Sequence, residues 1–125
     1  MAGERIAIVD DSEIVLAMAS TALESAGYTV RTAARWEELD RVIVEFSPGL
    51  IIMDINMPEI LGDDALAFFK EARQLDDVPI LLFSDIDVQE LEQRARAAGA
   101  DGFVSKSWSM ERLLEEVGKH LTRPV

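Results

Sequence analysis

The feature that most constrains the fold is a strict alternation of short apolar runs with longer stretches of helical periodicity. The apolar runs cover residues 5–10, 28–32, 50–54, 79–84 and 102–105. Between them apolar residues recur three and four positions apart, most clearly over residues 36–46 and 110–121. Five strand–helix units in this alternation predict one parallel sheet with helices on both of its faces.

The composition of the apolar runs indicates how the strands are ordered. Residues 6–9, 50–53 and 80–83 are continuously apolar, as expected for strands that are covered on both faces. The run 28–32 alternates with polar residues and the run 102–105 is short, so we place these two at the edges. Right-handed crossovers then favour the strand order 2-1-3-4-5. The predicted fold is α/β, a flavodoxin-like doubly wound sheet of five parallel strands with five helices.

Composition sets further bounds on the chain. Its 125 residues contain no linker or repeat, so we expect a single domain over residues 1–125 without an output domain. Acidic residues outnumber basic ones 24 to 12, and no basic patch suited to nucleic acid is present. The absence of cysteine excludes disulfides and thiolate metal sites. No apolar run reaches the roughly 18 residues of a membrane span, and a cytoplasmic protein is expected.

The carboxyl ends of four predicted strands carry acidic, hydroxyl or amine side chains. They are Asp10 and Asp11 after the first strand, Asp54 at the end of the third, Ser84 at the end of the fourth, and Lys106 after the fifth. In the predicted order the chain reverses direction between the first and third strands, and ligands of such sheets bind beyond the carboxyl ends at that point. We therefore expect these side chains to meet in one pocket.

The chemistry of this set favours phosphoryl transfer. Two carboxylates 4 Å apart repel by about 4 kcal/mol at an effective dielectric constant of ~20, so three together are unstable unless some are protonated or a cation lies among them. Mg²⁺ suits carboxylates and water in an open site, and an ammonium and a hydroxyl complete a site for a carboxylate nucleophile. Each residue also has a plainer interpretation: a strand-end acid caps a helix, Ser84 is a turn residue, and Lys106 is a solvated charge. Their combination favours the site.

These residues resemble the receiver domain of bacterial response regulators, and the resemblance covers nearly the whole chain. The motifs that carry it are Val9-Asp10-Asp11, Asp54-Ile55-Asn56-Met57-Pro58 with Gly62, Ser84 and Lys106. The resemblance implies that Asp54 accepts a phosphoryl group from a histidine kinase or a phosphotransfer protein. It also implies that the fourth helix, fifth strand and fifth helix form the face that controls a downstream protein target.

The same resemblance implies a metal site. The side chains of Asp11 and Asp54 and the backbone carbonyl of Asn56 would bind Mg²⁺, and Asp10 would act mainly through metal-bound water. Asp54 would thus serve both as a ligand and as the residue that is phosphorylated.

Three further residues acquire roles through the resemblance. Lys106 would pair with one phosphoryl oxygen, and Ser84 would move to donate a hydrogen bond to another. Phe103 would be the rotating aromatic that reports the state of Ser84. Its plainer interpretation is a core residue of a short edge strand, and we interpret the nearby Trp108 mainly as a packing residue.

Three positions depart from the family pattern. Ser107 stands where the family usually has a proline in a cis peptide, so a trans link and a shifted lysine loop are expected. Asp85 replaces a small residue next to Ser84, and a fourth carboxylate there would either hinder an anionic phosphoryl group or point into solvent. Asp63 replaces an apolar residue and is explained equally well as a helix cap.

The sequence leaves three functions open. The first is a phosphoacceptor switch with slow self-dephosphorylation, and the second is a pseudo-receiver that binds partners independently of phosphate. The third is a phosphatase or mutase with an aspartyl nucleophile, which needs a second acid two residues later, where this chain has Asn56. The lone His120 is interpreted as an exposed surface residue and not as a base.

Overall fold

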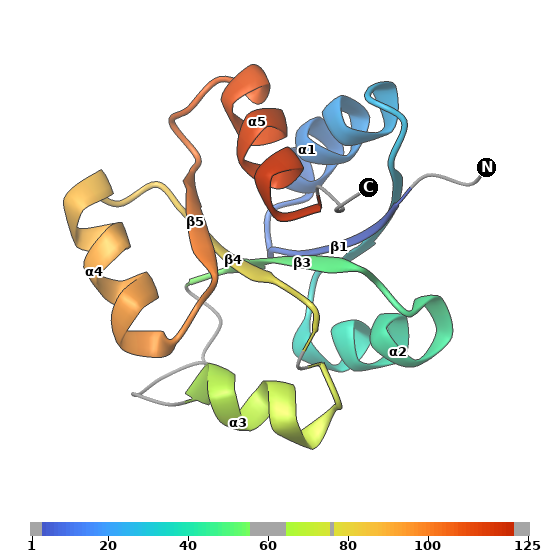
Figure 1. Cartoon of the computed structure of the whole chain (residues 1–125). Coiled ribbons are helices and arrows are strands. Elements are labelled where there is room, and N and C mark those ends of the chain that lie inside the picture. Colours follow the sequence, from blue (N-terminus) through green and yellow to red (C-terminus); the bar gives the residue numbers. More distant parts are fainter. Residues whose placement is uncertain (1–3, 56–64, 76, 122–125) are drawn as a thin grey trace.

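A computed structural model describes residues 4–55, 65–75 and 77–121 of the chain, and its strands and helices alternate without exception (Figure 1). The elements are β1 (Arg5–Val9), α1 (Glu13–Ser25), β2 (Thr29–Ala33), α2 (Trp36–Phe46), β3 (Leu50–Asp54), α3 (Ala65–Ala72), β4 (Ile80–Ser84), α4 (Val88–Ala98), β5 (Gly102–Ser105) and α5 (Met110–Leu121). The five predicted strand–helix units are confirmed, and the predicted strands differ from the observed ones by at most one residue at either end.

The sheet has the order β2-β1-β3-β4-β5, and all of its neighbouring strands run parallel. All five residues of β3 and of β4 are buried, whereas β2 is largely exposed. The flavodoxin-like doubly wound α/β fold predicted from the sequence is therefore confirmed, with the alternating run and the short run at the two edges.

Helices cover both faces of the sheet (Figure 1). On one face α1 and α5 pack against strand residues in a cluster that contains Leu16, Leu23, Leu113 and Val117. On the other face α2, α3 and α4 supply a second cluster, which includes Leu39, Ile43, Phe69 and Leu91. Successive strand residues such as Ile51 and Ile52 belong to opposite clusters, because the side chains of a strand alternate between its two faces.

Helix ends follow the local rules that the sequence suggests. Hydroxyl or carboxylate oxygens of Ser12, Asp87 and Ser109 accept hydrogen bonds from backbone N–H groups in the first turns of α1, α4 and α5. Gly27 and Gly99 follow α1 and α4 with φ angles of 100° and 80°, in the left-handed region that favours glycine. Among the described residues, no helix has both the length and the apolar character needed to cross a membrane.

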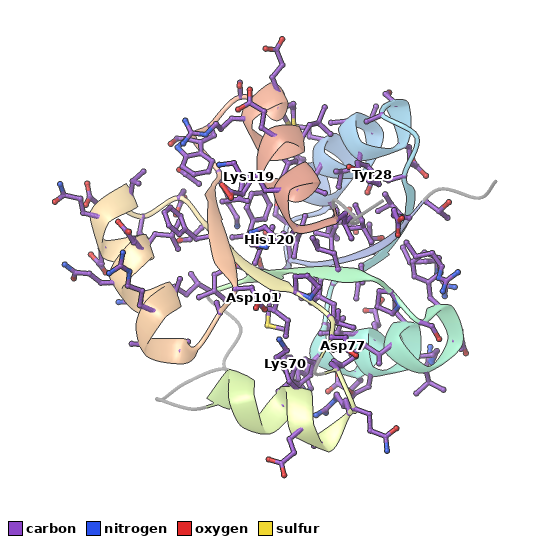
Figure 2. All side chains as sticks on the ribbon, in the orientation of Figure 1. Tyr28, Lys70, Asp77, Asp101, Lys119 and His120 are labelled. Atoms are coloured by element: carbon purple, nitrogen blue, oxygen red, sulfur yellow. The ribbon has the colours of Figure 1, made fainter. Side chains whose placement is uncertain are left out.

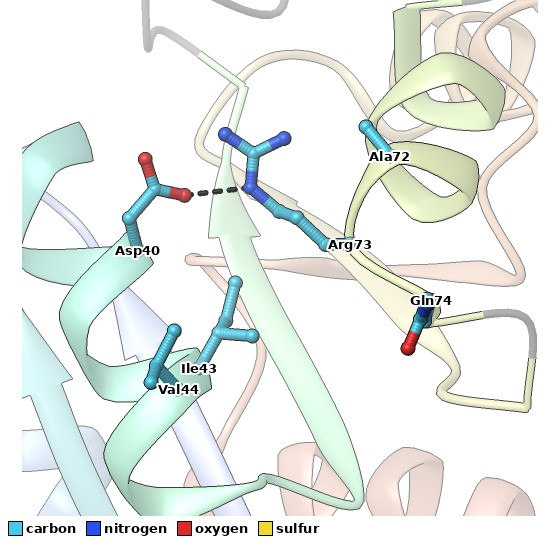
Figure 3. A pocket seen from close by; sticks show the side chains of 6 residues that line it. All are labelled: Asp40, Ile43, Val44, Ala72, Arg73 and Gln74. Carbon is cyan, nitrogen blue, oxygen red and sulfur yellow. Dashed lines mark hydrogen bonds and ion pairs between the residues drawn. The ribbon is translucent and has the colours of Figure 1, made fainter.

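Arg73 links the end of α3 to α2. Its Nε lies 2.6 Å from Oδ1 of Asp40, and its guanidinium lies 4.4 Å from the centre of the Phe69 ring. A groove beside this ion pair is lined by Asp40, Ile43, Val44, Ala72, Arg73 and Gln74 (Figure 3). This groove contains none of the residues that the sequence assigns to the acidic pocket.

Candidate functional site: an acidic pocket at the carboxyl edge of the sheet

The parallel strands bring the predicted site residues to one edge of the sheet. Asp10 directly follows β1, and Asp54 ends β3, which is the neighbour of β1 in the sheet. Ser84 ends β4, and Lys106 follows β5, the next two strands in the order. Asp10, Asp54 and Ser84 are at most 1% exposed. The strand order therefore brings the strand ends that carry these four residues to one edge of the sheet.

Three carboxylates gather at this edge. One oxygen from each of Asp10, Asp11 and Asp54 lies within 4.8 Å of the others, and Asp11 is exposed whereas the other two are buried. Two ligands on opposite sides of a Mg²⁺ ion lie about 4 Å apart, so oxygens separated by up to 4.8 Å would have to move slightly closer to hold a single ion. An exposed ligand also leaves room for the water molecules that Mg²⁺ usually retains.

Lys106 reaches into the same pocket. Its Nζ lies 2.7 Å from Oδ2 of Asp10 and 3.7 Å from Oδ1 of Asp54, with the side chain 17% exposed. The backbone N–H of Lys106 donates to the carbonyl of Ser84 at 2.7 Å, which fixes the start of the lysine loop on β4. In this state the ammonium therefore lies closer to Asp10 than to Asp54.

The acidic residues of the pocket raise the pKa of Lys106. Burial by itself would lower this pKa, but the contact with Asp10 and the charges of Asp54, Asp10 and Asp85 outweigh it and raise the pKa above 10.5. Lys106 is therefore a full positive charge at neutral pH. Asp85 contributes to this field although its side chain is exposed.

The donor set fits a divalent cation. Nζ of Lys106 lies 2.7 Å from Oδ2 of Asp10, but among the described residues of the cluster one ammonium faces three carboxylates and cannot neutralise them. A divalent cation would balance the remaining negative charge. Asn56, for which a carbonyl ligand is predicted, lies outside the described residues, as does Asp63.

The plainer interpretations of two site residues also hold. Oδ1 of Asp10 accepts from the N–H of Ser12 at 2.9 Å, which helps to start α1. Oγ of Ser84 accepts from the N–H of Ile86 at 3.2 Å, as a turn serine does. Asp10 thus has a local structural role and still contacts Lys106 in the pocket, so its two interpretations are compatible. Ser84 has the turn contact and ends the strand next to the one that Asp54 ends.

Phe103 and Trp108 pack against each other near the lysine. Their ring centres lie 5.8 Å apart, and the side chain of Phe103 is half-buried against the cluster beneath α4. The guanidinium of Arg112 lies 4.2 Å from the centre of the Trp108 ring. The packing role expected of Trp108 is therefore confirmed, and Phe103 contacts the core without being fully enclosed by it.

The structure tests two interpretations of the sequence, one of the Lys106–Ser107 peptide and one of His120. The peptide between Lys106 and Ser107 is trans, as predicted, and the lysine nevertheless reaches the pocket. The interpretation of His120 as an exposed surface residue is wrong. Its side chain is 23% exposed, and a Cβ atom on Gly102 would lie 3.0 Å from its Nε2, so the imidazole fills space that the glycine leaves open.

Sequence reasoning also missed Ser105. Its Oγ lies 2.7 Å from Oγ of Ser107 and accepts from the N–H of Ser107 at 3.2 Å, although Ser105 itself is buried. The signal that was available was the pair of serines on either side of Lys106 in Ser105-Lys106-Ser107.

Comparison with known proteins gives a consistent result. The sequence model of one protein family, described as the response regulator receiver domain, matches residues 6–118. The polar-differentiation response regulator DivK of Brucella ovis is 31% identical over 117 residues, which cover 93% of this chain and 94% of that protein. The structure of the chemotaxis protein CheY4 of Vibrio cholerae is similar with a TM-score of 0.82 and 32% identity, covering 96% of this chain and 100% of that one. A response regulator from Desulfuromonas acetoxidans gives a TM-score of 0.77 at 28% identity, with 95% and 99% covered.

Proposed function

The chain belongs to the response regulator receiver family of two-component signalling, and on that premise we propose that it is a phosphoacceptor switch. Receivers of this family interact with kinases or phosphotransfer proteins and with downstream targets, and they generally bind Mg²⁺ at an acidic pocket. In the proposal Asp54 is the phosphoacceptor, and a histidine kinase or a phosphotransfer protein is the donor.

One observation carries the proposal: a buried carboxylate at the end of a central strand faces an ammonium and two further carboxylates. Asp54 is 1% exposed, its Oδ1 lies 3.7 Å from Nζ of Lys106, and Asp10 and Asp11 lie within 4.8 Å. Burying like charges together lowers stability, so such a cluster indicates a site where a ligand or a reaction uses the charges. Phosphoryl transfer uses all of these groups.

The proposed reaction moves one phosphoryl group. A carboxylate oxygen of Asp54 attacks phosphorus and forms an acyl phosphate. The P–N bond of the donor phosphohistidine breaks, and its electron pair returns to the imidazole, which takes up a proton. Mg²⁺ held by Asp11, Asp54 and the carbonyl of Asn56, with Asp10 acting through water, would neutralise charge on the transferring oxygens.

The residues of the chain have separate tasks in this transfer. Lys106 shifts from Asp10 towards the new phosphoryl group and pairs with one of its oxygens. Ser84 accepts a hydrogen bond from Ile86 through its oxygen, so its own proton is available for a second phosphoryl oxygen. Two strengthened contacts bias the fold towards the phosphorylated state, because a switch responds only to differences in contact between its states.

Phe103 would transmit this change to the partner face. It lies two residues before Ser105, which pairs with Ser84 in the sheet, and its side chain is half-buried. Movement of Ser84 towards the phosphoryl group would free space for the ring to turn inward. The face formed by α4, β5 and α5 would then change its shape for a downstream protein.

The test is direct phosphorylation by a small donor. The protein is incubated with Mg²⁺ and acetyl phosphate, and its intact mass is measured over time. We expect one added phosphoryl group in the wild type, and no addition in Asp54→Asn or when the metal is chelated.

Absence of added mass in the wild type would reject the phosphoacceptor and favour the pseudo-receiver, an interaction module that does not depend on phosphate. Addition of mass to Asp54→Asn would place the acceptor elsewhere in the chain. Asp101→Asn serves as a matched acid-to-amide control outside the pocket and is expected to react like the wild type.

A further inference from the structure

The loop that carries Lys106 is a tight turn held by serine side chains. The N–H of Trp108 donates to the carbonyl of Ser105 at 3.1 Å, so residues 105–108 form a four-residue turn with Lys106 and Ser107 at its centre. Ser105 at the first position accepts from the N–H of Ser107 at 3.2 Å through its side chain. This is the local hydrogen bond by which serine stabilises turns.

A second contact closes the turn. The hydroxyl oxygens of Ser105 and Ser107 lie 2.7 Å apart, so one of them donates to the other. Ser105 is buried whereas Ser107 is exposed, so the pair joins the end of β5 to the outer side of the turn. Lys106 lies between the two serines, and its direction depends on the turn that they hold.

Proline at position 107 would remove both contacts. It has neither the N–H that donates to Ser105 nor a hydroxyl to pair with it. A trans proline would also disfavour the helical region for Lys106, and a cis proline would require a different type of turn. The serine pair therefore fixes this segment in a different way from the proline of the family pattern, and the peptide between Lys106 and Ser107 is trans.

We propose that Ser105 and Ser107 are positioning residues for Lys106. Their hydroxyl pair and the Ser107 N–H bond hold the turn that directs the ammonium to Asp10 and Asp54. The inference rests on the proposed function, because Lys106 acts on the phosphoryl group there. Neither serine contacts the reacting atoms.

The test compares four variants by their rate of phosphorylation with acetyl phosphate at saturating Mg²⁺. Ser105→Ala removes both side-chain contacts and Ser107→Ala removes the hydroxyl pair, so we expect the maximal rate to fall roughly two- to tenfold, as the loss of one or two hydrogen bonds predicts. Ser107→Thr keeps a hydroxyl and is expected to restore most of the wild-type rate.

The matched control is Ser109→Ala. Ser109 lies two residues further on and accepts from the N–H of Arg112 at 3.2 Å, so this variant loses a helix cap without touching the turn. It should lower the unfolding free energy and leave the rate unchanged. Wild-type rates in Ser105→Ala and Ser107→Ala, or failure of Ser107→Thr to restore the rate, would overturn the positioning role.

A second measurement separates this inference from the proposed function. Crystal structures of the unphosphorylated wild type and of Ser105→Ala report the position of Nζ of Lys106 even if the protein accepts no phosphoryl group. Departure of Nζ from ion-pair distance of Asp10 in the variant supports the inference. An unchanged lysine overturns it, whatever the phosphorylation assay shows.

Discussion

The two ends of the parallel strands, the amino edge and the carboxyl edge of the sheet, differ in how their charged side chains are paired. At the amino edge Asp101 precedes β5, and its Oδ2 lies 3.1 Å from Nζ of Lys70 and accepts from the N–H of Ile80 at 2.8 Å (Figure 2). One acid there meets one base and one backbone donor. At the carboxyl edge, as far as the described residues extend, the ammonium of Lys106 faces a cluster of three carboxylates.

This difference separates a structural contact from a functional one. An acid matched with one base and one donor ties α3 to the strands β4 and β5, and it needs no ligand to do so. An excess of like charge opposes folding, because each pair at 4 Å repels by about 4 kcal/mol at an effective dielectric constant of 20. Sequences retain such arrangements where a ligand or a reaction uses them.

The largest contrast is expected from removing the lysine at each edge. Lys106→Met should slow phosphorylation by acetyl phosphate about 10²–10³-fold, the usual effect of losing a preorganised group that stabilises charge in the transition state. Lys70→Met should keep the wild-type rate. The measurement is the rate of mass gain at saturating Mg²⁺. Equal rates in the two variants would remove the distinction between the edges.

Metal binding should stabilise the protein through the carboxyl edge alone. At a Mg²⁺ concentration 100 times its dissociation constant, the free energy of unfolding should rise by about 2.7 kcal/mol. Asp11→Asn removes a metal ligand and should abolish most of this gain, whereas Asp101→Asn should retain it. Urea unfolding with and without Mg²⁺ measures both. A full gain in Asp11→Asn would exclude that side chain as a ligand.

Without metal, the same acid-to-amide change should have opposite effects at the two edges. Asp54→Asn removes one buried negative charge from the cluster and should raise the free energy of unfolding by about 1 kcal/mol. Asp101→Asn keeps an oxygen for Ile80 but loses the charge that faces Lys70, and because this acid is partly exposed it should lower stability by about 0.5–1 kcal/mol. Urea unfolding in a chelator gives both signs, and a shared sign would contradict the comparison.

The fold could be predicted almost completely from the sequence, because burial and periodicity act locally. β3 and β4 are continuously apolar since both of their faces are covered, and this single property placed them inside the sheet. The ends of three strands differ from their predicted positions by one residue. The residues before β4 and β2, Pro79 and Tyr28, read as apolar continuations, although the strands begin one residue later.

The membership of the pocket could be predicted from strand order, but its pairing could not. Strand ends fix where Asp10, Asp54 and Lys106 begin, whereas the direction of a long flexible side chain depends on the field of all of its neighbours. That Lys106 lies nearer to Asp10 than to Asp54 is a result of this kind. His120 was misinterpreted because its packing depends on the missing side chain of Gly102, which is 18 residues away in the chain.

The smallest expected effect concerns alkaline pH. The folded protein raises the pKa of Lys106 above 10.5, so the lysine contributes stability that is fully present below that value and is lost as the pH rises through the folded pKa. The difference in unfolding free energy between the wild type and Lys106→Met should therefore stay constant at neutral pH and change in favour of the variant above about pH 10.5. Urea unfolding at a series of pH values measures it. Because the other titrating groups are common to both proteins, a constant difference across the alkaline range would show that the acids of the carboxyl edge do not hold this ammonium in solution.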